Sequence, residues 1–267
     1  MADTGSAIGP CRKGDHQSVN VTLKGQRFAI KPYVGDEVRV RRGLSDRQLA
    51  DLTTDAYGEP GELLQRWLSL ADVMVVASQD GTPRGFMMGR LLRPDVLLFI
   101  AAMVHPVARR LGLLSYMSAY VVWVAWLARV RSAGWRLWQS AQTLYLTFRT
   151  ANPVLYSSVA KKVRLNPSPD CREVSSSETE IATLVARAYG VEDGFDRTTF
   201  VMHGALLPYP DLIYRPNRIP WCDDRAINDF FRELLRLEEM QGNDLVAVGK
   251  VPVGAAFTLL ASKRLAR

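Results

Sequence analysis

Two arginines and a glycine lie at the junction of a long apolar run and a long run without charge. Residues 96–104 are all apolar, Arg109 and Arg110 follow, and Gly112 is the second residue of the uncharged run that begins at Leu111. The first run predicts a buried strand and the second a helix. A helix start offers backbone N–H groups that lack intrahelical partners, and arginines beside it add positive charge. The junction therefore predicts a site for a phosphorylated ligand, with a pyrophosphate at the helix N-terminus.

The same junction resembles the acyl-CoA signature of the GNAT acyltransferase superfamily. There a strand that ends in Val-x-Pro is followed by Arg/Gln-x-x-Gly-x-Gly/Ala, and this chain reads Met103-Val-His-Pro-Val-Ala-Arg-Arg-Leu-Gly-Leu-Leu. Arg109 and Gly112 match the pattern. Leu114 stands where the pattern has a small residue, so its side chain must turn away while its N–H still points to the ligand. The resemblance extends over residues 36–162 and 244–251.

The resemblance implies an acyl-CoA cosubstrate, acetyl-CoA or another acyl-CoA, and no metal. In the family the pantetheine arm lies beside the third meander strand, which here implies main-chain contacts from residues 102–104. Asn152 looks like the family's asparagine near the pantetheine, and the alternative is that it only caps a helix. The predicted cofactor-binding residues are Ala102, Met103, Val104, Arg109, Arg110, Leu111, Gly112, Leu113, Leu114 and Asn152.

Acyl transfer to an amine needs a group that takes the amine proton and a group that protonates the departing thiolate. Many GNAT relatives use a glutamate on the meander, but residues 96–104 include no carboxylate. The family's usual tyrosine acid would fall at Val159. The catalytic candidates are Tyr156, His105 and Tyr145, with Tyr116 as a further tyrosine. Each tyrosine can instead be a packed side chain, and a mechanism that relies on orientation would need no base.

Secondary-structure signals around the junction predict a mostly antiparallel, mixed sheet flanked by helices, an α+β fold like that of the GNAT superfamily. Helices are predicted at 45–57, 61–70, 112–133, 152–162, 177–189 and 225–240, and strands at 19–30, 37–42, 73–78, 84–92, 96–104, 143–148 and 244–251. Ser45 is a predicted N-cap.

The predicted domain organisation has four parts. Residues 1–20 form a disordered tail, 21–162 the acyl-CoA-binding core, 163–241 a mostly helical or irregular insert, and 242–267 the final strand or strands. The insert is rich in proline and aromatic residues, which suits a cap over the acceptor site. Its aromatic anchors are Tyr189, Phe195, Phe200, Tyr209, Tyr214 and Trp221.

The net charge of the chain and its distribution indicate which kinds of ligand the protein binds. The chain has 267 residues, a formal net charge of +7 and a pI near 9.5. Its basic residues are scattered, which favours a phosphorylated small molecule over nucleic acid. Cys11, Cys171 and Cys222 show no metal-ligand or disulfide spacing. Because neither the cysteines nor the three histidines show metal-ligand spacing, we expect no metal. The N-terminal residues lack an apolar signal segment and the cysteines suit reduced thiols, so we expect a cytoplasmic protein.

The run from Leu111 to Ala128 leaves a second interpretation open. It is uncharged and reaches the lower length limit of a membrane span, although a buried central helix or a homodimer contact also fits. The predicted function is an acyl-CoA-dependent N-acyltransferase that acts on a small-molecule amine. The alternatives are a non-catalytic acyl-CoA-binding protein on the same fold and a membrane-associated protein.

Overall fold

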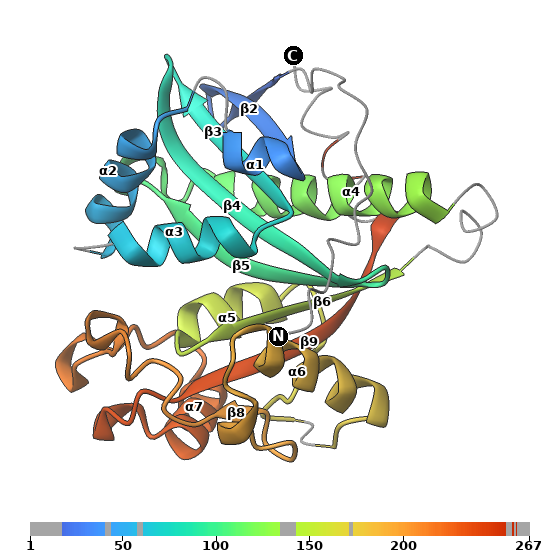
Figure 1. The fold of residues 1–267 in the computed structure, drawn as a ribbon. Coiled ribbons are helices and arrows are strands. Elements are labelled where there is room, and N and C mark those ends of the chain that lie inside the picture. The colour runs from blue at the N-terminus through green and yellow to red at the C-terminus, as the bar shows by residue number, and fades with distance from the viewer. Residues whose placement is uncertain are drawn as a thin grey trace. The chain divides into compact units, whose positions relative to one another are not determined.

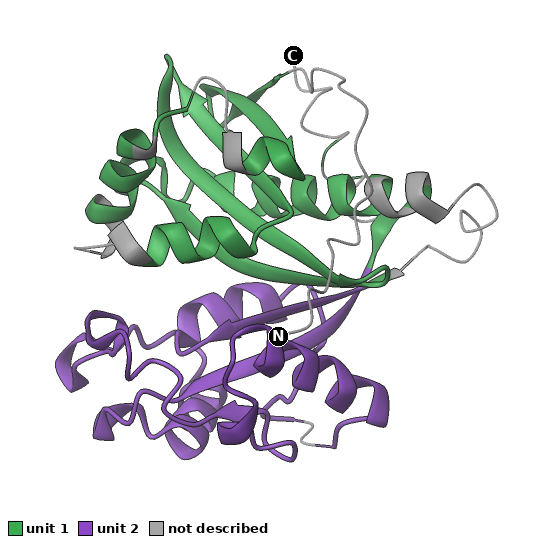
Figure 2. Cartoon of the chain, viewed as in Figure 1, with its two compact units in different colours: residues 1–144, 252–267 green, residues 145–251 purple. Residues whose placement is uncertain are grey.

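The computed structural model describes residues 18–40, 44–57, 61–133, 143–170, 173–254, 258 and 260. The chain forms two compact units, which Figure 2 distinguishes by colour: residues 1–144 with 252–267, and residues 145–251. Residues 1–17 of the predicted tail lie outside the described residues, and the chain is already in a strand at Val19. The units divide the chain at other points than the predicted domains, because the strand before Asn152 groups with the insert.

Unit 1 is built on five consecutive antiparallel strands. They are β1 (Val19–Leu23), β2 (Gln26–Val34), β3 (Val73–Gln79), β4 (Thr82–Arg93) and β5 (Val96–Val104). The predicted meander is confirmed, and the single strand predicted at 19–30 is a hairpin. Lys24 and Gly25 turn that hairpin at φ 47° and 82°, the left-handed pair that suits a two-residue loop between twisted strands.

Helices cover both faces of this sheet (Figure 1). They are α1 (Asp36–Val40), α2 (Asp46–Tyr57), α3 (Gly61–Leu70) and α4 (Leu113–Ala133). Ser45 caps α2 as predicted, since its hydroxyl accepts from the N–H of Gln48 at 3.2 Å. The strand predicted at 37–42 is wrong: residues 36–40 form α1, whose first turn holds Asp36 and Glu37 at the positive amide end.

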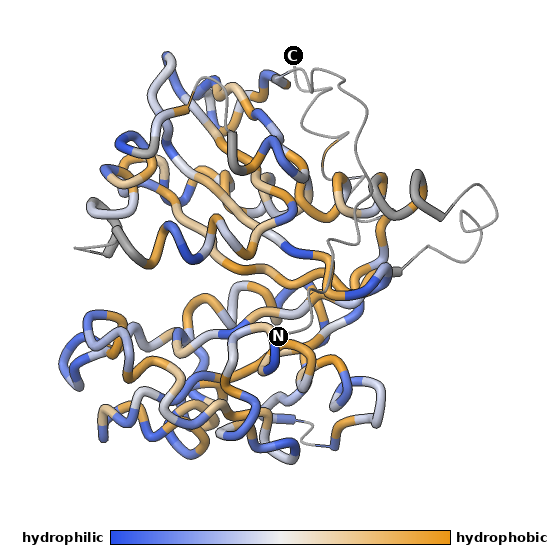
Figure 3. Tube along the Cα trace, in the orientation of Figure 1, coloured by the Kyte–Doolittle hydropathy of each residue, from blue (hydrophilic) through white to orange (hydrophobic). Residues whose placement is uncertain are grey.

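Two glycines of β4 let α4 approach the sheet closely. A Cβ at Gly85 would meet the Cε of Met117 at 3.1 Å, and one at Gly89 would meet a Cγ of Val121 at 3.0 Å. Met117 and Val121 are fully buried, and Figure 3 shows β5 as a largely apolar strand of the same sheet. α4 is therefore a packed core helix. Among the described helices, none is both long and apolar enough to span a membrane.

Unit 2 holds the rest of the chain. Its elements are β6 (Thr143–Thr150), α5 (Pro153–Ala160), β7 (Leu165–Asn166), α6 (Ser176–Ala188), β8 (Val201–Met202), α7 (Arg225–Leu235) and β9 (Asp244–Pro252). Both β7 and β8 pair antiparallel with β9, and the Thr147 hydroxyl donates to the Ala247 carbonyl at 3.0 Å to tie β6 to β9. Its core centres on Tyr156, whose ring packs 5.2 Å from that of Phe231.

Short 3-10 turns complete the described chain: η1 (Pro106–Ala108), η3 (Glu192–Gly194), η4 (Pro210–Leu212), η5 (Pro216–Arg218) and η6 (Leu237–Glu239). The structure thus has the predicted class, an α+β fold with a mostly antiparallel sheet flanked by helices.

Candidate functional site

The segment between β5 and α4 is held in a defined shape by its own backbone. The N–H of His105 donates to the Arg84 carbonyl at 2.9 Å, which anchors the segment to β4. Inside η1, the N–H of Ala108 donates to the His105 carbonyl at 2.9 Å, and the His105 ring nitrogen Nδ1 accepts from the N–H of Val107 at 3.3 Å. His105 therefore orients the loop, and its ring is partly buried.

Two residues before α4 take the left-handed backbone conformation. Arg110 has φ 64° and Gly112 has φ 87°. This conformation costs an L-residue about 1–2 kcal/mol, so its presence at an arginine marks a position that the surrounding structure holds in place. Left-handed residues at the start of a helix turn successive N–H groups toward one side and create an anion-binding concavity. Together with the first amides of α4, this geometry suits a pyrophosphate.

The surroundings of these amides are open and positively charged. Among the described residues, no atom would lie within 4 Å of a Cβ at Gly112, so they leave the backbone there open to a ligand. Arg109 and Arg110 are both exposed, and the Nε of Arg109 donates to the Val104 carbonyl at 3.2 Å. That bond holds the stem of the Arg109 side chain beside the end of β5. Leu113 is buried, whereas Leu111 and Leu114 are half-buried.

The three β5 residues predicted to contact pantetheine lie in regular strand pairing. Ala102, Met103 and Val104 are opposite Met87, Phe86 and Gly85 of β4. The side chain of Met103 is buried, and those of Ala102 and Val104 are half-buried. Further back along β5 the register shifts by one residue at the bond between Met88 and Gly89 of β4. Such a bulge bends a strand and increases its twist.

Both the oxygen and the nitrogen of the Asn152 side-chain amide form hydrogen bonds. Its Oδ1 accepts from the N–H of Leu155 at 3.0 Å, the bond of an N-cap, and its Nδ2 donates to the hydroxyl of Tyr214 at 3.1 Å. The N-cap bond decides the orientation of the amide, because only the oxygen can accept it. The N-cap role is thus confirmed, and Tyr214, an aromatic residue of the insert, lies directly beside Asn152.

The candidate tyrosines differ in accessibility. Tyr156 is fully buried, and its hydroxyl donates to the Pro167 carbonyl at 2.6 Å. Burial, with the charge of Asp170 adding to it, holds the pKa of Tyr156 well above its usual range. These contacts give Tyr156 a structural role. Tyr116 is also buried, whereas Tyr145 is half-buried, with the Lys250 ammonium 5.3 Å from the centre of its ring.

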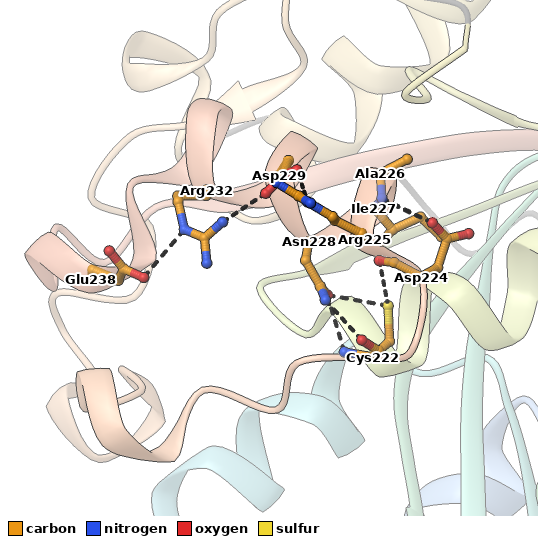
Figure 4. Close-up of polar contacts among 9 residues, drawn as sticks. All are labelled: Cys222, Asp224, Arg225, Ala226, Ile227, Asn228, Asp229, Arg232 and Glu238. Atoms are coloured by element: carbon orange, nitrogen blue, oxygen red, sulfur yellow. Dashed lines mark hydrogen bonds and ion pairs between the residues drawn. The ribbon is translucent and has the colours of Figure 1, made fainter.

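The segment that carries Tyr214 is held by side-chain hydrogen bonds where it joins α7 (Figure 4). The side-chain amide of Asn228 makes two hydrogen bonds to the main chain of Cys222. Its Oδ1 accepts from the Cys222 N–H at 3.0 Å, and its Nδ2 donates to the Cys222 carbonyl at 2.7 Å. Asp224 caps α7 through the N–H of Ala226 at 3.0 Å. Within the insert, these bonds fix the chain just before α7 to the start of that helix. They involve polar residues that the sequence does not distinguish from solvated ones.

One buried charge in unit 2 escaped prediction from the sequence. Asp244, at the start of β9, is almost completely buried and lies 3.5 Å from the Nε of Arg149. The Arg149 guanidinium stacks 4.1 Å from the centre of the Tyr189 ring. Burial raises the pKa of Asp244 to about 6, against the opposing effects of Arg149 and the Leu245 N–H. Its only sequence signal is a carboxylate at the head of an apolar strand.

Comparison with solved structures returns acetyltransferases. An IAA acetyltransferase from Bacillus cereus is 15% identical at a TM-score of 0.34, and the match covers 51% of this chain and 74% of that one. A GCN5-related N-acetyltransferase from Sphaerobacter thermophilus is 16% identical at a TM-score of 0.34, with 51% and 43% covered. A protein from Mycobacterium tuberculosis in complex with CoA and NLQ is 11% identical at a TM-score of 0.37, with 84% and 98% covered.

No protein-family model and no curated protein matches the chain. The solved structures that resemble it include members of the superfamily named from its sequence, as predicted. At these identities and TM-scores the likeness carries no argument about function, which has to be inferred from the residues of this chain.

Proposed function

We propose that this protein is an acyl-CoA-dependent N-acyltransferase that transfers an acyl group, most simply acetyl, to the amine of a small molecule. The observation that carries the proposal is the left-handed backbone of Arg110 and Gly112 before α4. It presents main-chain amides beside two exposed arginines, the combination that binds a pyrophosphate. Of the residues predicted to contact the pantetheine arm, the main chain of residues 102–104 belongs to unit 1 and Asn152 to unit 2.

In the proposed reaction the amine nitrogen attacks the thioester carbonyl, the carbon–sulfur bond breaks and the thiolate leaves. β5 bears no carboxylate, and Tyr156 is committed to Pro167. Orientation of the two substrates would therefore supply most of the acceleration, with solvent taking the ammonium proton. We assign acceptor specificity to residues 163–241, and the contact between Tyr214 and Asn152 supports this assignment because it places an insert aromatic at a proposed cofactor residue.

The direct test is thioester turnover. Incubation with acetyl-CoA and a panel of primary amines is expected to release free thiol in an amine-dependent way, followed by a thiol-reactive dye. Acetylated amine should appear in equal amount by mass spectrometry. Tight CoA binding without amine-dependent thiol release would favour the alternative, a non-catalytic acyl-CoA-binding protein, and absence of CoA binding would exclude both.

Replacement of Asn152 by serine separates its two roles. Serine caps a helix about as well as asparagine, so we expect stability to change by less than about 0.5 kcal/mol. It removes the Nδ2 donor, and CoA affinity measured by calorimetry is expected to fall about fivefold, the effect of about one lost hydrogen bond. Tyr214→Phe is the matched control, because it removes the other partner of the 3.1 Å bond and keeps the amide. If Asn152→Ser binds CoA like the wild type, Asn152 is only an N-cap.

A further inference from the structure

Arg84 is the extra residue of a β-bulge. β3 pairs Ser78 with Pro83 and Ala77 with Gly85, so Arg84 has no opposite residue on that strand. On its other side the carbonyl of Arg84 accepts the N–H of His105, the first residue of the loop to α4. Bulges occur preferentially beside active sites, where they re-aim one side chain without disturbing the rest of the sheet. The bulge thus sets the direction of an arginine at the edge of the proposed cofactor loop.

The guanidinium of Arg84 is half-buried and lacks an anion. Its Nε is inaccessible to solvent and has no hydrogen-bond acceptor within the described part of the chain. Six other arginines of the described chain have carboxylate partners: Arg93, Arg149, Arg187, Arg225, Arg232 and Arg236. A buried donor without an acceptor costs about 1–3 kcal/mol, and no carboxylate of the described residues balances this guanidinium. The two terminal nitrogens of Arg84 are not among the buried unpaired atoms, so they are the ones that a ligand can reach.

We infer that Arg84 binds the carboxylate of the acceptor, which makes the acceptor an amino acid or a similar carboxylate-bearing amine. The inference rests on the proposed function and narrows its substrate class. Arginine presents a planar fork that matches a carboxylate with two parallel hydrogen bonds. The phosphates of the cofactor have other partners in the proposal, namely the loop amides with Arg109 and Arg110, which are exposed.

The test compares amino acids with their carboxamides, which keep the amine and side chain but lose the anion. Binding to the wild-type protein is measured by calorimetry in the presence of CoA, and turnover by thiol release. We expect the best amino acid to bind at least about thirtyfold more tightly than its carboxamide, the size of a lost bidentate pair. Arg84→Gln should remove this difference mainly through KM, and Arg84→Lys should retain part of it.

Arg90→Gln is the matched control, because Arg90 is a half-buried arginine on the same strand. It should leave the difference between acid and amide intact. Equal binding of acids and amides to the wild type, or an unchanged preference in a folded Arg84→Gln variant, overturns the inference. If Arg84→Gln instead weakens CoA more than dephospho-CoA, the anion belongs to the cofactor, which also overturns it. Failure of the proposed function is separate, since it shows as absent CoA binding or absent thiol release.

Discussion

Replacing Arg109 and Arg110 together by alanine is expected to weaken coenzyme A binding at least about tenfold, because hydrogen bonds to charged groups contribute about 1.5–3 kcal/mol each. Both side chains are exposed beside the left-handed backbone that precedes α4. Alanine at position 110 meets the same backbone cost as arginine at φ 64°, so the variant removes charge and leaves the loop conformation comparable. Calorimetry at fixed ionic strength measures the change.

The control is a second double variant, Arg27→Ala with Arg47→Ala. These arginines are also exposed and lie in the same unit, at β2 and α2. Both double variants remove two positive charges from a formal net charge of +7, so a general electrostatic attraction would weaken equally in each. Specific binding at the α4 N-terminus requires a loss in the first variant alone. Unchanged affinity in that variant would remove the pyrophosphate from this position.

Most of the fold around this loop could be predicted because its signals are local. Turn residues such as Asp80 and Gly81 separate the meander strands, and Ser45 and Asn152 precede their helices as N-caps. Each of these side chains acts within a few residues of its own position. The strand predicted at 37–42 was wrong because it, too, relied on a local pattern, the alternation of apolar and charged residues. Alternation over a few residues also fits a short helix, and the acidic first turn of α1 decides between the two.

The parts of the candidate site that escaped prediction depend on distant residues. The sequence identified Arg110 as a charge, but its left-handed backbone follows from the closure of the loop between β5 and α4. The bond between Asn152 and Tyr214 joins residues that are 62 positions apart. The bulge that isolates Arg84 arises from the register of β3 against β4. Residue type gives the available chemistry, and only the packed chain shows which groups meet.

Asp244 leads to the second large expected effect, on stability as a function of pH. Its pKa of about 6 in the folded protein lies above the ordinary value of 3.8, because burial disfavours the charged form more than Arg149 and the Leu245 N–H favour it. The folded state therefore holds the proton more tightly than the unfolded state does. The contribution of Asp244 to stability is fully present below about pH 4 and is lost as pH rises through about 6. The difference in pKa corresponds to about 3 kcal/mol.

Asp244→Asn should abolish this dependence, because asparagine keeps the shape and does not titrate. Denaturant unfolding of both proteins between about pH 4 and pH 7 should show the wild type losing about 3 kcal/mol relative to the variant as pH rises. The variant also leaves Arg149 without its carboxylate partner, which lowers the free energy of unfolding by an amount that does not change with pH. The test is therefore how the difference in unfolding free energy between the two proteins changes with pH. A constant difference for Asp244→Asn would contradict the raised pKa, and a difference of opposite sign would mean that Arg149 outweighs burial.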